Sequence, residues 1–516
     1  MKSLITNDRK HEEKQMSTTF DQLTPYLDKN MAFQTALTLL DWDTETLAPP
    51  AAIDYTSKVI GLLSVEAYHS FINDDVKELL QKLSTKEEQE QLTEAQKAIV
   101  RNLKKDFEEM ACIPPEEYQL FQELLATSTS IGFQAKRENR FEDFAPVLEQ
   151  IVMYTKKFAV YRCKNGENPY DLLLNDHEEG FSTKELDVFF AKLRETIVPL
   201  LKKVTLKNAS IDKNYNFLQY DVKKQKTFCH FLAEYIGFDF ERGVIGDSEH
   251  PFTTNLHNHD VRITNHIYED NLESAIFSII HEVGHGLYEM GVDDALTQTP
   301  IGGGVSMGMH ESQSRFYENI IGRSKQFWEP IYEQLQEFYP EQLQDVCLEQ
   351  FIKGINKAEP GFIRTEADEL TYCLHIMVRY EIEKMLFADE ITVADLPRVW
   401  NEKYEEYLGI TPPTDTLGVL QDMHWSGGSF GYFPSYALGN AIAAQLYYYM
   451  LDVMPFYDYL REGNLSPIRE FFREHIHQYG GMRPTNRLLK DLTGEEFNPD
   501  YYVRYLTEKY TALYKL

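Results

Sequence analysis

Two histidines one helical turn apart are the residues of this sequence with the clearest chemistry. They stand in the segment His281-Glu282-Val-Gly-His285, inside a stretch whose pattern predicts a helix from Leu272 towards Glu289. Because residues i and i+4 project from one face of a helix, both imidazoles can bind one tetrahedral zinc ion. Glu282 then lies beside the ion, where its carboxylate can take a proton from a water molecule. The segment therefore predicts a hydrolytic zinc site.

The opposing interpretation is a solvated surface helix that carries two unrelated histidines. The neighbouring residues fit it poorly, because most of them are apolar: Ala275, Phe277, Ile279, Ile280 and Val283. A helix with apolar residues on most sides is a buried helix. A pair of histidines in such a helix favours a shared ligand.

A catalytic zinc ion also needs a third protein ligand and an open coordination position. Glu311 is the candidate, because the chain after His285 is long enough for the helix to end, a loop to turn and a second helix to return. Arg315 can orient Glu311 or form an ordinary surface salt bridge with it. The loop from Pro300 to His310 is rich in glycine, and no Lys-Ser or Lys-Thr follows it. We therefore expect close backbone approach to a ligand or metal ion rather than a nucleotide site.

Long stretches with helical spacing surround this segment and predict a mostly α-helical fold. Capping boxes at Ser84 with Glu87 and at Ser182 with Glu185 predict the starts of two long helices, the first a single helix over 86–110. An exception is the stretch 237–266, where short extended runs mix with turn residues directly before the predicted metal helix. A small β region is expected there.

The composition limits the class of protein. The chain has 516 residues, a net charge of −31 and 43% hydrophobic residues, which suffice for a large core. The acidic balance argues against nucleic acids and anionic membranes as partners, because both require basic surfaces. No run approaches the ~20 apolar residues of a membrane helix.

The compartment and the domain limits follow from simpler signals. The N-terminus lacks an apolar signal segment, and the 5 scattered cysteines form no CxxC motif, so we expect free thiols in a reducing cytoplasm. No linker or repeat divides the chain, and we treat 20–516 as one helical domain. Residues 1–19 are expected to be a mobile N-terminal tail. Translation can start at Met1 or at Met16.

Six short motifs, in order along the chain, give the sequence a resemblance to the carboxypeptidase Taq family of zinc metallocarboxypeptidases. The motifs are His250-Pro-Phe, Asp260-Val-Arg262-Ile-Thr, His281-Glu-Val-Gly-His285, His310-Glu311-Ser-Gln, Ile363-Arg364-Thr-Glu-Ala-Asp368 and Gly418-Val-Leu-Gln-Asp422-Met-His424-Trp425. The HExxH motif alone is moderately specific, whereas six motifs in one order are highly specific. The resemblance runs from Phe20 to the C-terminus.

This resemblance implies a bundle-like helical unit with a small β-sheet beside a deep active-site groove, often as a homodimer. It implies one metal ion per chain, zinc or in some relatives cobalt, with His281, His285 and Glu311 as ligands and Glu282 as general base. The implied activity is the stepwise release of amino acids from the C-terminus of peptides, with broad specificity.

An enzyme that cuts only at the C-terminus must bind the α-carboxylate of its substrate. Guanidinium groups suit this task, because they bind a carboxylate through two hydrogen bonds. Arg262 and Arg364 stand inside two of the motifs, and Arg262 lies on a predicted strand along which an extended substrate could bind. The alternative for each arginine is a structural ion pair, for example Arg364 with Asp368 at i+4.

Three further residues are candidates for contact with the substrate. His424 and Tyr432 flank a glycine-rich turn that can fold over a site, and we expect them to donate hydrogen bonds to the oxyanion of the reaction. His250 is a candidate substrate contact. For each of the three, the alternative is a structural side chain with an ordinary hydrogen bond.

Two other functions fit the same zinc motif. An oligopeptide endopeptidase on a similar helical groove also uses HExxH, and it would cleave peptides whose C-terminus is amidated. A non-catalytic helical scaffold with a structural metal ion is disfavoured, because Glu282 is retained. A nucleotide-dependent enzyme lacks both a Walker motif and a Rossmann fingerprint.

Overall fold

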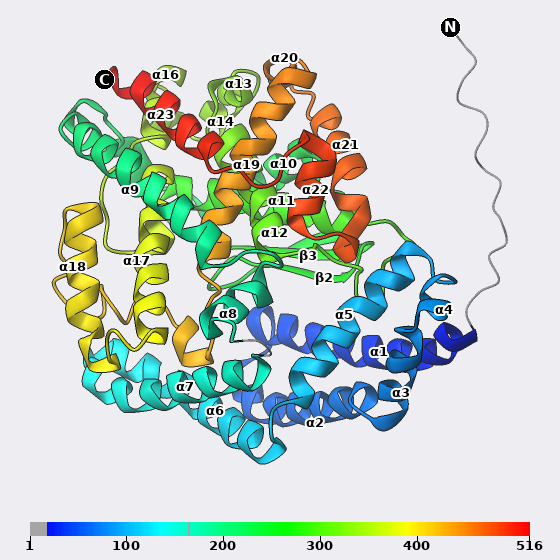
Figure 1. Cartoon of the computed structure of the whole chain (residues 1–516). Helices are drawn as coiled ribbons and strands as arrows, with labels where there is room; N and C mark the ends of the chain where they lie inside the picture. The colour runs from blue at the N-terminus through cyan, green and yellow to red at the C-terminus, as the bar shows by residue number, and fades with distance from the viewer. Residues whose placement is uncertain (1–17, 164–165) are drawn as a thin grey trace, which may run out of the picture.

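The computed structural model describes residues 18–163 and 166–516 and is mostly helical, as the sequence predicts (Figure 1). Residues 1–17, which make up most of the predicted tail, lie outside the described residues. Thr18 and Thr19 already belong to the first helix, and Thr19 is fully buried. None of the described helices is long and apolar enough to cross a membrane.

The N-terminal helices gather on one side of the molecule, blue in Figure 1. They are α1 (Thr18–Thr46), α2 (Ile53–Phe71), α3 (Asp74–Leu83), α4 (Lys86–Gln89) and α5 (Glu94–Ala111). The next helices, cyan to green, are α6 (Pro115–Glu138), α7 (Phe141–Arg162), α8 (Pro169–His177), α9 (Thr183–Thr205) and α10 (Val222–Ile236).

The single helix predicted over 86–110 is wrong, because the chain forms α4 and α5 with a break between them. Thr93 starts the second helix through a capping box of its own. Its hydroxyl accepts a bond from the backbone N–H of Gln96 at 3.2 Å, and the Gln96 side chain accepts one from the backbone N–H of Thr93 at 3.0 Å. The capping box at Ser182 is present at the start of α9, as predicted.

Three strands form the predicted β region: β1 (Gly243–Asp247), β2 (Thr253–His257) and β3 (Asp260–Asn265). Their order is β1-β3-β2, with β3 parallel to β1 and antiparallel to β2. α11 (Leu272–Gly291), which carries the HExxH motif, packs against β3 and β2. α1 packs against β2, and its Trp42 ring lies near Gly246 of β1. The sheet therefore separates the N-terminal helices from the metal helix.

The chain after α11 forms the centre, the upper part and the left side of the molecule in Figure 1. Its first part comprises α12 (Met307–Arg315), the π-helix η4 (Phe316–Ile321), α13 (Lys325–Trp328), α14 (Tyr332–Phe338), α15 (Pro340–Leu343) and α16 (Leu348–Ile355). Its second part comprises α17 (Glu369–Phe387), α18 (Leu396–Leu408), the 3₁₀-helix η7 (His424–Gly427), α19 (Pro434–Val453), α20 (Phe456–Arg461), α21 (Ser466–His475), α22 (Thr485–Thr493) and α23 (Asp500–Tyr514).

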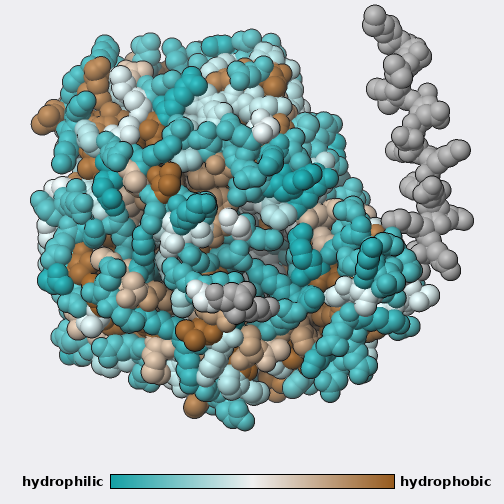
Figure 2. Space-filling model, viewed as in Figure 1, coloured by the Kyte–Doolittle hydropathy of each residue, from teal (hydrophilic) through white to brown (hydrophobic). Residues whose placement is uncertain are grey.

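Two groups of buried apolar side chains stabilise this arrangement. The larger group extends from Ala135 to Tyr514 and encloses α11, α12, α17 and α19. The smaller group joins α1, α3 and α5 to Val292, Leu296 and Ile301, which follow α11. Figure 2 shows that one outer face is mostly hydrophilic with scattered hydrophobic residues, as expected for a chain with a net charge of −31.

Candidate metal centre

The predicted metal helix is α11, and its limits match the prediction. The Asn271 side chain accepts a hydrogen bond from the backbone N–H of Ser274 and so begins the helix. Gly284 lies where α11 meets α12, and a Cβ at this position would be 2.7 Å from the Cα of Ser314. Only glycine allows the two helices to approach this closely, and the approach brings the histidines of α11 to Glu311.

The three predicted ligands converge. Nε2 of His281 and Nε2 of His285 are 3.2 Å apart, and each lies 3.5 Å from Oε2 of Glu311. These residues form a group able to hold a metal ion. Ligand atoms around a tetrahedral ion with bonds of about 2.1 Å are about 3.4 Å apart, so the observed distances fit such an ion.

Neighbouring side chains orient both imidazoles so that Nε2 faces this group. Nδ1 of His281 lies 2.9 Å from Oε2 of Glu318 on the π-helix η4. Nδ1 of His285 lies 2.5 Å from Nδ1 of His310, whose Nε2 lies 2.6 Å from Oε1 of Glu289. Such outer contacts commonly fix the tautomer and ring orientation of metal-binding histidines. Burial also lowers the pKa of His285 to about 3, which keeps its imidazole neutral.

Glu311 is held by its own helix and by α19. Arg315 donates from Nε to Oε1 of Glu311 at 2.7 Å, which confirms the predicted orienting contact. Burial disfavours the Glu311 carboxylate, but the positive charges of Arg315 and His281 outweigh burial and lower the pKa of Glu311 below its usual value. On α19, a Cβ at Gly439 would lie 2.5 Å from Cγ of Glu311, so only glycine fits against this side chain.

Glu282 lies on the side of α11 that faces β2. Its Oε2 accepts a hydrogen bond from Oγ1 of Thr253 at 2.6 Å. Burial raises the pKa of Glu282, while the charge of His281 and the Thr253 hydroxyl act in the opposite direction. A carboxyl group with a raised pKa is better able to accept and return a proton near neutral pH.

The glycine-rich loop contacts Glu289 and His310, which lie behind the three predicted ligands, and not the predicted ligands themselves. The backbone N–H of Gly304 donates to Oε1 of Glu289 at 3.1 Å, and a Cβ at Gly304 would lie 2.5 Å from Cδ2 of His310. The expected close approach is therefore present, but it acts on the His310–Glu289 pair.

Arg364 and Arg315, the residue that binds Glu311, both contact the side chain of Tyr372. Nη1 of Arg364 is 3.2 Å from the hydroxyl of Tyr372, and the guanidinium of Arg315 lies 4.3 Å from the centre of the same ring. The alternative pair of Arg364 with Asp368 is wrong, because Asp368 caps α17 through the backbone N–H groups of its first turn.

The partner of Arg364 is instead Asp422, from the last of the six motifs. Arg364 donates to Oδ1 of Asp422 from Nη2 at 2.8 Å, and Arg379 donates to Oδ2 from Nε at 2.7 Å. Burial opposes the Asp422 carboxylate, but the two guanidinium groups outweigh it and hold its pKa far below the usual range. Two positive charges thus face one negative charge.

His424 and Tyr432 lie in the same part of the structure. Their rings are 5.5 Å apart, and Nε2 of His424 is 3.4 Å from the hydroxyl of Tyr436 at the start of α19. The Arg364 guanidinium lies 5.0 Å from the centre of the Tyr436 ring. The structure therefore brings His424, Tyr432 and Arg364 together beside the helix that contacts Glu311.

Arg262 and His250 do not lie with Arg364, His424 and Tyr432. Ile263 of β3 faces α11, where a Cβ on Gly286 would contact it at 3.3 Å, so its neighbour Arg262 points to the opposite face of the sheet. There Arg262 donates to Asp260 at 2.8 Å and lies 5.7 Å from the centre of the Trp42 ring.

β3 is the central strand and both of its edges are already paired, so a substrate cannot add to β3 as a further strand. His250 is exposed in the loop between β1 and β2. Neither residue has a contact with the three predicted ligands among the described interactions.

Several residues of the site carried no clear sequence signal. Glu318 follows Glu311 by two turns, and a helical pattern does not mark it as a partner of His281. Thr253 and Arg379 come from β2 and α17, which only the folded chain brings to the site. Asp422 and Arg364 both stand inside motifs, but nothing in the sequence pairs them with each other or with Arg379.

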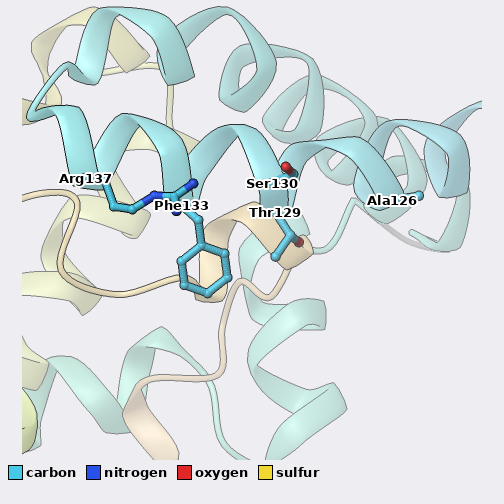
Figure 3. Close-up of a pocket in the computed structure, with 5 residues that line it drawn as sticks. All are labelled: Ala126, Thr129, Ser130, Phe133 and Arg137. Atoms are coloured by element: carbon cyan, nitrogen blue, oxygen red, sulfur yellow. The ribbon is translucent and has the colours of Figure 1, made fainter. Parts of the chain in front are cut away.

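A separate hollow lies along α6 (Figure 3), and its lining contains neither a carboxylate nor an imidazole. The lining residues are Ala126, Thr129, Ser130, Phe133 and Arg137. None of these side chains can bind a metal ion as a carboxylate or imidazole would, so this hollow offers no second metal site.

The HExxH motif on α11, Glu311 on the neighbouring helix α12 and the surrounding helices define a metallopeptidase. The chain belongs to the carboxypeptidase Taq (M32) family of metallopeptidases, whose model matches residues 22–510. It is 44% identical to carboxypeptidase 1 of Bacillus subtilis over 485 residues, which cover 94% of this chain and 96% of that relative. It is 36% identical to thermostable carboxypeptidase 1 of Pyrococcus furiosus over 503 residues, 97% of this chain and 100% of the relative.

A solved structure gives the same result. The M32 carboxypeptidase from Deinococcus radiodurans matches with a TM-score of 0.93 at 33% identity, covering 97% of this chain and 100% of that one. The protein is therefore a metallocarboxypeptidase, a peptide hydrolase with a metal-binding site. This membership sets aside the endopeptidase and the non-catalytic scaffold.

Proposed function

We propose that the protein binds one zinc ion through His281, His285 and Glu311 and releases amino acids stepwise, with broad specificity, from the C-terminus of peptides. The observation that carries this proposal is the convergence of the three ligand atoms at 3.2–3.5 Å beside the carboxylate of Glu282. The two nitrogens and one carboxylate oxygen are donors typical of catalytic zinc, and cobalt is the alternative ion. When bound, the ion supplies a Lewis acid that lowers the pKa of water and polarises the scissile carbonyl.

Glu282 acts as the general base in this proposal. Its carboxylate takes a proton from the attacking water and later gives it to the leaving amine. Thr253 holds Oε2 of Glu282 in one orientation, which leaves Oε1 free of that contact. His424 and Tyr432 then donate hydrogen bonds to the oxyanion from the side of α19.

Arg364 recognises the C-terminal carboxylate of the peptide. Support comes from the charges around Asp422. The two guanidinium groups of Arg364 and Arg379 bind this one carboxylate, so one positive charge remains in excess. Arg379 has no exposed surface, whereas Arg364 is 6% exposed and faces Tyr436. A substrate carboxylate bound to Arg364 would balance the excess charge in a buried environment, where such pairing is strongest.

Arg262 and His250 remain candidates for contact with more distant parts of the peptide. Arg262 lies on the face of the β-sheet opposite to α11, and His250 is exposed in the loop between β1 and β2. The family resemblance supports a homodimer. The 5 cysteines are all unpaired, which supports a reducing cytoplasm. We also propose that residues 20–516 act as one domain, since the larger group of buried residues reaches from α6 to α23 and the smaller one joins α1, α3 and α5 to residues that follow α11.

Time-resolved mass spectrometry of one peptide as free acid and as amide tests this function. The free acid should lose one residue after another from its C-terminus, and a chelator should abolish the reaction. The amide should be cleaved far more slowly. Internal cleavage of both peptides at similar rates would contradict carboxylate recognition, and full activity in excess chelator would contradict the metal site.

A further inference from the structure

A buried carboxylate that takes no part in the proposed reaction lies on α17. Glu383 has no exposed surface, and its carboxylate accepts three hydrogen bonds. The donors are the hydroxyl of Tyr170 at 2.9 Å, Nε1 of Trp425 at 2.8 Å and the backbone N–H of Gly431 at 2.8 Å. Because an unpartnered carboxylate is costly to bury, the three donors are what allow it to stay at this position.

Two of the three donors bracket the segment that carries the proposed substrate contacts. Trp425 directly follows His424, and Gly431 directly precedes Tyr432. Between them the chain turns back on itself: Gly431 has a φ of +76°, and a Cβ there would lie 2.7 Å from the carbonyl carbon of Leu173. One carboxylate therefore joins the two ends of this turn.

α17 holds the same segment at a third point. Arg379 lies one helical turn before Glu383 on the same face and binds Asp422 at 2.7 Å. The indole of Trp425 also packs at 90° against the ring of Trp400, with ring centres 6.1 Å apart. The segment 422–431 is thus fixed to one rigid helix by an ion pair and by both oxygens of Glu383.

We propose that Glu383 is a positioning residue that holds His424 and Tyr432 in the geometry required for substrate binding. This inference rests on the proposed function, in which His424 and Tyr432 contact the peptide. Glu383 does not touch the substrate; it acts by holding the two ends of the turn together.

Glu383→Gln is the most direct test, because the amide keeps the shape of the side chain but has only one acceptor atom. In the protein, Trp425 uses Oε1 and Gly431 uses Oε2. In either orientation of the amide, one of these two bonds is lost and a nitrogen faces an N–H group. Trp425→Phe removes one of the same bonds from the side of the turn and leaves Glu383 unchanged.

Tyr170→Phe is the matched control. It also removes a hydrogen bond to Glu383, but from α8, and it leaves both bonds to the turn intact. If Glu383 were needed only for stability, Glu383→Gln and Tyr170→Phe would lower the melting temperature without a selective effect on KM.

We expect Glu383→Gln and Trp425→Phe to raise KM for a free-acid peptide by about tenfold, the effect of one lost hydrogen bond, with little change in kcat. Metal affinity, measured by competition with a chelator, should be unchanged. Tyr170→Phe should keep the wild-type KM. Equal KM values for Glu383→Gln and Tyr170→Phe would overturn the inference. If Glu383→Gln does not fold, the same comparison of KM is made between Trp425→Phe and Tyr170→Phe.

His424→Ala and Tyr432→Phe separate this inference from the function on which it rests. If these variants leave KM unchanged, the proposed substrate contacts are wrong. If they raise KM while Trp425→Phe and Glu383→Gln do not, the contacts are right and the positioning role of Glu383 is wrong.

Discussion

Oε2 of Glu318 lies 2.9 Å from Nδ1 of His281 and 2.9 Å from Nη1 of Arg315. Arg315 in turn binds Glu311 at 2.7 Å, so the Glu318 carboxylate contacts one predicted metal ligand directly and a second through Arg315. Glu318 belongs to a π-helix, a form that occurs mostly as short insertions at functional sites.

Glu318→Gln should weaken metal binding by about ten- to a hundredfold, the usual effect of losing an outer partner of a histidine ligand. The amide can no longer balance Arg315 and His281 together. A chelator competition at constant pH measures the metal Kd, with the exposed Glu333→Gln as control. A Kd equal to that of the wild type would show that Glu318 does not support the site.

Glu282→Gln should retain the metal ion and lower kcat by at least about a hundredfold, because the base is lost while the shape is kept. His285→Ala is the contrasting variant, since it should lose the metal ion itself. Metal content and single-turnover rates distinguish the two effects. Near-normal turnover of Glu282→Gln would mean that another group accepts the proton.

Arg364→Ala should lower kcat/KM on free-acid peptides by about ten- to a hundredfold and should matter far less on amidated peptides. The loss of one charge-assisted hydrogen bond, worth roughly 1.5–3 kcal/mol, accounts for this range. Structural collapse would instead lower both activities together with the melting temperature.

Asp422→Asn should destabilise the fold most at neutral pH, because two buried guanidinium groups lose their counter-charge, at a cost of about 3–5 kcal/mol. The pKa of Asp422 is lowered in the folded protein, so its stabilising effect is complete above the ordinary value of 3.8 and declines as the pH falls below it. The difference in melting temperature between wild type and variant should therefore be constant from pH 8 to about pH 5 and narrow in stronger acid. A difference that grows on acidification would contradict the ion pair.

Gly439→Ala should reduce both stability and metal affinity, because the new methyl group would lie 2.5 Å from Cγ of Glu311. Gly61→Ala is the matched control, since this helical glycine has no neighbour within 4 Å of the added atom. Helix propensity alone should make the control neutral or slightly stabilising. Equal behaviour of the two variants in thermal and chelator titrations would show that the contact with Glu311 is unimportant.

The sequence was informative where the relevant contacts are local. His281 and His285 share a helix, and the apolar residues on most of its sides predict that this helix is buried. Glu311 follows after one loop, which restricts where its helix can return. The β region was found in the same way, from alternation over a few residues.

Long-range contacts were not accessible to this reasoning. Strand alternation shows that Arg262 and Ile263 point to opposite faces, but only the fold shows that α11 covers the face of Ile263. Asp422 could not be paired with Arg364 and Arg379 without knowing that α17 lies beside the turn. The break after α4 was missed because a strong helical pattern concealed the competing cap at Thr93.

The packing of α19 against α12 has a consequence for how the enzyme is made. The HExxH helix leaves the ribosome well before α19, which contacts Glu311 through Gly439, and before α23, which packs on α19. A nascent chain thus carries both predicted histidine ligands before the helix that packs against Glu311 has been made. We therefore expect chains stalled before Pro434 to bind a metal ion weakly. Metal binding would then come late in biosynthesis and would favour the finished fold over incomplete ones.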